Sequence, residues 1–116
     1  MQLTRISTNE RLSSAIAYGS LVFLSGQVPG VASDIHGQTR EVLGKIDALL
    51  AEAGTDKANL LSATIYLKDI GTDFEAMNEV WSAWLPAGHA PTRTTVQAEL
   101  ARPSVRVEIT VIAARP

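Results

Sequence analysis

The chain has 116 residues, of which 46% are hydrophobic and 19% are charged, and its formal net charge is −2. This length and composition predict one globular domain rather than a disordered chain or two domains. Because there is no cysteine, disulfides, thiolate metal sites and a cysteine nucleophile are excluded. The basic residues are scattered along the chain, which argues against a dedicated nucleic-acid surface.

The first residues, MQLTRISTNERL, lack the apolar segment that a signal peptide needs. The longest apolar run, residues 21–24, is far too short to span a membrane. We therefore expect a cytoplasmic protein with no membrane partner.

The first third of the chain is expected to form strands. Residues 2–6 are compatible with a short strand, and residues 15–17 and 21–28 predict a hairpin around the turn at Gly19. Both alternating sets in residues 21–24 are apolar, which predicts that this strand is covered on both faces.

Two amphipathic helices are expected. In the first, apolar residues recur at intervals of three and four from Val42 to Ala53, with Ser33 or Asp34 as the cap and Gly54 at the end.

The second helix follows a half-exposed strand at residues 61–67. Thr72 and Glu75 have the spacing of a capping box, apolar residues continue helically to Leu85, and Pro86 ends the helix.

Two more strands, residues 93–100 and 105–113, complete the order β, β, β, α, β, α, β, β. Two helices can cover only one face of such a sheet, which predicts an α+β domain. The other face must meet solvent or another subunit, and the doubly apolar strand at residues 21–24 favours another subunit.

The last two strands carry the candidate site. If their apolar faces meet the helices, the residues expected together on the opposite face are Arg93, Thr95, Gln97 and Glu108. There Arg93 could clamp a ligand carboxylate, and Glu108 could hold a water. Judged by periodicity alone, two solvated strand residues or a mutual ion pair are the simpler interpretation.

Other chemistry-bearing residues give weaker signals. His36 and His89 have no neighbours at metal-ligand spacing, so no metal site is predicted. Ser25 lies in LSGQ rather than in a G-x-S-x-G motif, and its glycine is expected to allow a bend or a close backbone approach. Trp81 and Trp84 are expected in the core.

The segments LSGQVP, QTREVLGKID, ATIYLKDI, DFEAMNEVW and APTRTTVQAEL…VRVEITVIAA, in this order, resemble the Rid family (reactive intermediate deaminase A; YjgF/YER057c/UK114). The resemblance covers residues 1–116 as a single Rid/YjgF-like domain. It implies a mixed six-stranded sheet with two helices on one face, similar to the Bacillus type of chorismate mutase. It also implies a homotrimer whose sheets form a barrel-like core.

The resemblance further implies hydrolysis of reactive 2-enamino or 2-imino acids to 2-oxo acids and ammonia, without metal or organic cofactor, in clefts between subunits. By position, Arg93 matches the arginine that binds the substrate carboxylate, and Glu108 matches the glutamate that positions water. Ser25 and Asn78 match further cleft residues.

This chain departs from the family pattern at two cleft positions. Leu12 stands in place of the usual tyrosine, and Thr95 in place of the usual cysteine, although the backbone N–H of Thr95 remains available. Two alternatives stay open: a non-catalytic module that senses a small carboxylate, and a ribonuclease or translation inhibitor. A sequence pI of about 5.6 argues against the second.

Overall fold

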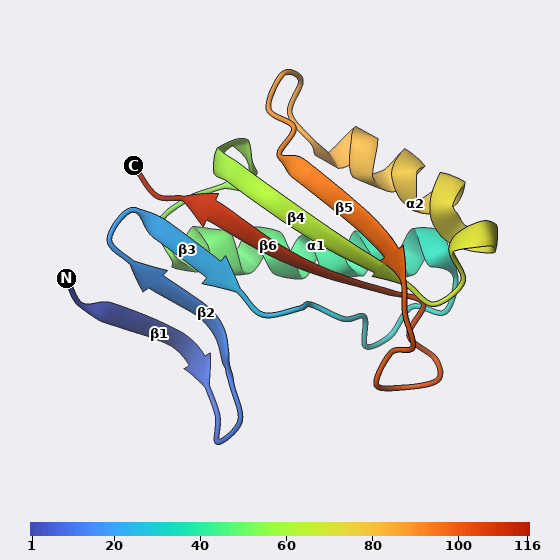
Figure 1. Cartoon of the computed structure of the whole chain (residues 1–116), viewed down its shortest axis with the longest axis horizontal. Helices are drawn as coiled ribbons and strands as arrows, with labels where there is room; N and C mark the ends of the chain where they lie inside the picture. Colours follow the sequence, from blue (N-terminus) through green and yellow to red (C-terminus); the bar gives the residue numbers. More distant parts are fainter.

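The computed structural model describes all 116 residues as one sheet backed by two helices (Figure 1). The strands are β1 (Leu3–Thr8), β2 (Ser13–Tyr18), β3 (Leu21–Leu24), β4 (Leu60–Leu67), β5 (Thr92–Gln97) and β6 (Val107–Ala114). The helices are α1 (Ile35–Glu52), α2 (Ile70–Trp84) and a short 3₁₀ turn (Lys57–Asn59). The predicted order of elements and the α+β class are confirmed.

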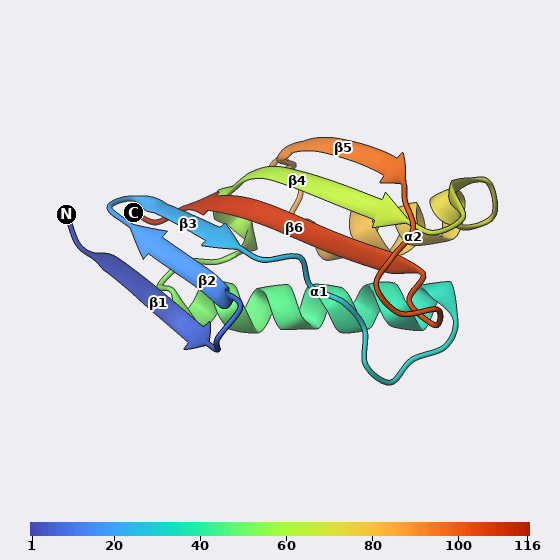
Figure 2. The ribbon, with the colours of Figure 1, turned by 60° about the horizontal axis from the view of Figure 1, so that its bottom comes forward.

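The six strands form one mixed sheet in the order β1-β2-β3-β6-β4-β5. Only β4 and β5 run parallel, and α2 is the crossover connection that a parallel pair requires. Figure 2 shows both helices on the same side of the sheet, as predicted. Neither helix is both long and apolar enough to cross a bilayer.

The core lies between the helices and the sheet. The predicted apolar stripe of α1 is fully buried at Val42, Ile46 and Leu50, and Gly54 ends the helix with a φ of +86°. Asp34 occupies the N-cap position, but its side chain accepts no capping hydrogen bond.

The predicted start of α2 is wrong. The helix begins at Ile70, and the N-cap is Asp69, whose Oδ1 accepts a hydrogen bond from the Thr72 backbone N–H at 3.1 Å. A second early N–H is satisfied from a distant strand, because Gln97 Oε1 on β5 accepts from Ile70 N at 3.0 Å. A capping pattern within the helix could not reveal this tertiary partner.

The open face of the sheet, which points away from the helices, carries exposed apolar side chains. Leu21 and Phe23 of β3 are on this face, beside half-buried Ile112, whereas Val22 and Leu24 are buried beneath the helices. This placement of both sets was predicted. Such a patch marks an interaction surface, so cover by another subunit stays a prediction.

A buried ion pair ties α2 to the strand that carries Glu108. Asp73 is 1% exposed, and its carboxylate accepts two hydrogen bonds from the Arg106 guanidinium, at 2.6 and 3.0 Å. Arg106 N in turn donates to Gln38 Oε1 of α1 at 2.8 Å. These contacts fix the start of β6 against both helices.

Replacing Asp73 with alanine is expected to lower the free energy of unfolding by about 2 kcal/mol, because the half-buried Arg106 loses its only carboxylate partner. Urea unfolding measures the loss. Asp34→Ala is the matched control: this exposed aspartate at the N-cap of α1 makes no capping hydrogen bond, and its removal should cost no more than about 0.5 kcal/mol. Equal losses for both variants would show that the buried pair contributes nothing.

Candidate active site

The pairing of β5 with β4 decides where Arg93 points. Arg93 lies opposite Ala63, and Thr95 lies opposite Ile65. Neighbours in register point to the same side of a sheet, and Ala63 and Ile65 are buried beneath the helices. Arg93 and Thr95 therefore face α2. The prediction that they share the open face with Glu108 is wrong.

The reason lies in the polar partners that α2 offers to this edge strand. Arg93 Nη1 donates to Asn78 Oδ1 at 2.7 Å, and Gln97 accepts from the backbone of Ile70. The more apolar alternation set of β5, including the exposed Val96, faces away from the helices. Gln97 therefore also departs from the predicted face.

Arg93 forms the centre of the first group, which we call the arginine half-site. Its guanidinium carbon lies 5.8 Å from the ring centroids of both Phe74 and Trp81, and its only side-chain hydrogen bond is to the neutral Asn78. Burial lowers the pKa of the Arg93 guanidinium. Nearby in the strand, the buried hydroxyl of Thr95 has no hydrogen-bond partner. A half-buried cation without a counter-ion is suited to bind an anion.

Glu108 forms the centre of the second group, the glutamate half-site, on the open face. It lies opposite Tyr66, and its carboxylate makes no hydrogen bond or ion pair. Gly26 approaches so closely that a side chain there would overlap the Glu108 carboxylate. An isolated bridge holds Gly26 in place, with Gln27 N donating to Ile109 O at 2.8 Å. The expected close backbone approach at Gly26 is confirmed.

An open depression of about 410 Å³ surrounds Glu108. Its lining residues are Gly26, Tyr66, Ala98, Glu99, Leu100, Glu108 and Thr110.

Ser25 immediately precedes Gly26 of the glutamate half-site. Ser25 Oγ donates to Ser13 O at 2.6 Å, and Ser25 N donates to Ser14 O at 2.9 Å, so the serine ties this segment to β2. The Ser25 hydroxyl proton is thus committed to the backbone. Leu12 immediately precedes Ser13 and is exposed.

The two half-sites are separated within one chain. Glu108 lies opposite Tyr66, which pairs with Val96, and Val96 follows Arg93 by three residues on β5. Strand spacing and residue rise place the Cα atoms of Arg93 and Glu108 roughly 14 Å apart, and their side chains leave opposite faces of the sheet. A small substrate cannot touch both within one subunit.

Some members of the half-sites were not predicted. Phe74 and Trp81 accompany Asn78 around Arg93, and their spacing of four and three residues on α2 is the signal that could have identified them. Trp81 is buried, as expected, and Trp84 packs partly buried against the core. No three histidine, cysteine or acidic side chains come together as a metal-ligand set.

Substituting Gly26 with alanine is expected to remove the imine hydrolysis that the family resemblance implies while the chain still folds, because the new methyl group must displace the Glu108 carboxylate. Gly71→Ala is the control, since a Cβ there meets its nearest neighbour at an ordinary 3.7 Å. Turnover and urea unfolding are measured for both variants. Full activity in Gly26→Ala would show that the position of the carboxylate is unimportant.

The loop that follows Gly26 is held by Glu41 of α1. Its carboxylate accepts hydrogen bonds from the backbone N–H groups of Gly30 at 2.6 Å, Val31 at 3.1 Å and Ala32 at 3.0 Å. These bonds, that of Ala32 foremost, lower the pKa of Glu41 below its ordinary value of 4.5. The stabilisation is present above pH 4.5 and is lost as the pH falls through the lower folded-state value.

The parent is therefore expected to be more stable than Glu41→Gln at about pH 7, and this difference should shrink at about pH 3, because the unfolded chain is protonated below pH 4.5 and the folded one follows as the pH falls further. Urea midpoints at the two pH values measure it. Glu52→Gln, at the exposed end of α1, should show no such change. A difference that persists undiminished in acid would contradict the role of the charge.

Comparisons with known proteins agree with this fold. The family model described as Endoribonuclease L-PSP matches residues 2–115. The RutC family protein YoaB of Escherichia coli is 41% identical over 114 residues, covering 98% of this chain and 99% of its own length. A RutC family protein of Haemophilus influenzae is also 41% identical, over 97% of this chain and 98% of its own.

Solved structures share the fold of this chain. A YjgF-family protein from Neisseria meningitidis is 46% identical with a TM-score of 0.97, covering 100% of this chain and 97% of its own. Yeast Mmf1 is 25% identical with a TM-score of 0.91, covering 99% and 100%. The chain therefore belongs to the Endoribonuclease L-PSP family, together with the YjgF and RutC proteins.

Proposed function

We propose that this protein hydrolyses small 2-imino and 2-enamino acids to 2-oxo acids and ammonia. The observation that carries the proposal is the Arg93 guanidinium, which is half-buried, lies 5.8 Å from the centroids of two aromatic rings and has no carboxylate partner. A substrate carboxylate would supply the missing anion through a bidentate pair.

The proposed reaction needs one water molecule held in position. An enamine first becomes an imine when a proton is added at carbon and another is lost from nitrogen, and water then adds to the C=N carbon. Glu108 accepts a proton from that water as the C–O bond forms and returns it to nitrogen, which gives a carbinolamine. The proton of the new hydroxyl group then moves to nitrogen, the C–N bond breaks as the C=O bond forms, and ammonia leaves the 2-oxo acid. Imines hydrolyse without a catalyst, so orientation of the substrate against a held water supplies most of the acceleration.

A cleft that holds both Arg93 and Glu108 must take them from two different subunits, because these side chains leave opposite faces of one sheet. The exposed apolar residues of the open face support an assembly that buries this face. We propose a homotrimer in which each cleft combines the arginine half-site of one subunit with the glutamate half-site of its neighbour. Thr95, Ser25 and Leu12 then line the cleft.

Ammonia release tests the activity. An amino-acid oxidase generates the imine in solution, and the rate of ammonia formation is followed with and without this protein over a series of side chains. Acceleration that is lost in Arg93→Ala supports the proposal. Tight binding of the 2-oxo acid without acceleration would instead identify a carboxylate-sensing module.

A further inference from the structure

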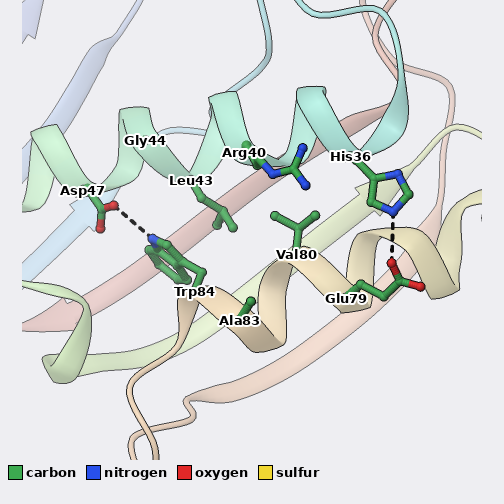
Figure 3. Close-up of a pocket in the computed structure, with 9 residues that line it drawn as sticks. All are labelled: His36, Arg40, Leu43, Gly44, Asp47, Glu79, Val80, Ala83 and Trp84. Atoms are coloured by element: carbon green, nitrogen blue, oxygen red, sulfur yellow. Dashed lines mark hydrogen bonds and ion pairs between the residues drawn. The ribbon is translucent and has the colours of Figure 1, made fainter.

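A second cavity lies on the outer surface of the helix layer, in the groove between α1 and α2. Its volume is about 370 Å³ (Figure 3). Leu43 of α1 and Val80 of α2 are buried and form its apolar floor, and Trp84 closes one end. Arg93, Glu108 and the residues that accompany them do not line this groove.

Gly44 keeps this groove open. It lies within α1, where glycine is less favourable than alanine. A Cβ at Gly44 would meet no atom within 4 Å, so close packing does not explain the glycine. Its effect is to leave space beside Leu43, between Arg40 one turn before it and Asp47 one turn after it.

The acidic side chains of the groove already have donors. Asp47 Oδ2 accepts from Trp84 Nε1 at 3.0 Å, and Glu79 Oε2 lies 3.0 Å from His36 Nε2. Figure 3 shows these two contacts at opposite ends of the groove, with Arg40 between them.

Arg40, in contrast to these acidic residues, has no partner side chain in the groove. Its guanidinium makes no ion pair and no hydrogen bond to another side chain, although it borders the apolar floor. A second cation lies at the tryptophan end, where Lys57 Nζ is 5.1 Å from the centroid of the Trp84 ring. The groove thus offers a planar fork of donors, an apolar floor and an aromatic wall within one small space.

We propose that this groove is a second ligand site, which binds a small monocarboxylate with an aromatic or branched apolar body. The carboxylate pairs with Arg40, and the apolar body lies on Leu43 and Val80 against the Trp84 ring. Gly44 provides the room for it. The site is independent of the proposed hydrolysis, because none of its residues belongs to either half-site.

Phenylacetate is the probe, and the Arg93→Ala protein is used so that the first site does not compete. Binding is followed by the NMR signal of the Trp84 indole N–H, which donates to Asp47 within the groove. We expect saturable shifts of the Trp84 signal at millimolar phenylacetate. The neutral amide phenylacetamide and the cation phenethylamine should each bind roughly tenfold more weakly, because neither carries the negative charge needed for an ion pair with Arg40.

Two further changes in the same protein test the geometry. Arg40→Ala should weaken phenylacetate binding roughly tenfold, with Arg11→Ala, another exposed arginine, as the matched control. Gly44→Leu keeps Arg40 and favours the helix, yet it should fill the groove and remove binding. No shift of the Trp84 signal, stronger binding of phenethylamine, or unchanged binding in Arg40→Ala or Gly44→Leu would overturn the proposal.

Discussion

Replacing Arg93 with alanine is expected to abolish binding of pyruvate, the simplest 2-oxo acid, while the chain remains folded. Arg93 is at an edge strand and is only half-buried, so its loss opens no cavity in the central core. Truncating one partner of a desolvated charge pair costs roughly 2–5 kcal/mol of binding energy. Calorimetry with pyruvate measures the effect.

Arg93→Lys and Arg11→Ala sharpen this comparison. Lysine keeps the charge but cannot reproduce two parallel N–H···O bonds or the contact of a planar group with the rings of Phe74 and Trp81, so it should restore binding only in part. Arg11→Ala removes an exposed arginine elsewhere and should leave binding unchanged. If Arg93→Ala binds pyruvate as tightly as the parent, Arg93 is only a strand residue that packs against α2.

Glu108→Gln is expected to lower turnover by roughly 10²–10⁴ while pyruvate still binds, because the amide cannot accept the proton of the attacking water. Glutamine has the same shape, so the contact with Gly26 is kept. Glu99→Gln is the matched control, since Glu99 lines the same depression. Ammonia release from the imine measures both. A larger loss in Glu99→Gln would show that Glu99, rather than Glu108, accepts the proton.

The sequence predicted the element order and the face of β6 correctly because both follow from local patterns. The stripe from Val42 to Leu50 has a helical period, and Val107, Ile109 and Val111 alternate with polar residues as a half-covered strand does. Each pattern allows only one orientation that buries its apolar side chains, and the structure has that orientation.

The face of β5 could not be predicted in the same way. Thr94 and Val96 are no more apolar than many exposed pairs, and the opposite set of Arg93, Thr95 and Gln97 is polar. What decides between the two faces is a distant helix: Asn78 and the first N–H of α2 satisfy polar side chains that a local pattern assigns to solvent. Tertiary hydrogen bonds override alternation at such an edge.

The division of the candidate site has the same origin. Fifteen positions separate Arg93 from Glu108 in the sequence, and nothing in that spacing says that β4 lies between their strands or that their side chains leave opposite faces. The sequence nominates Arg93 and Glu108 as candidates, whereas the pairing of β4 with β5 and β6 shows that one chain keeps them on opposite faces of the sheet.

The most direct test of a shared cleft is complementation between the two inactive variants. Arg93→Ala and Glu108→Gln chains with different affinity tags are co-expressed, and assemblies that carry both tags are purified. In a cyclic trimer of both variants, one cleft of three joins an intact Arg93 to an intact Glu108, so the account predicts about one third of the parent's ammonia-releasing activity. Mixed assemblies that are as inactive as each variant alone would contradict it.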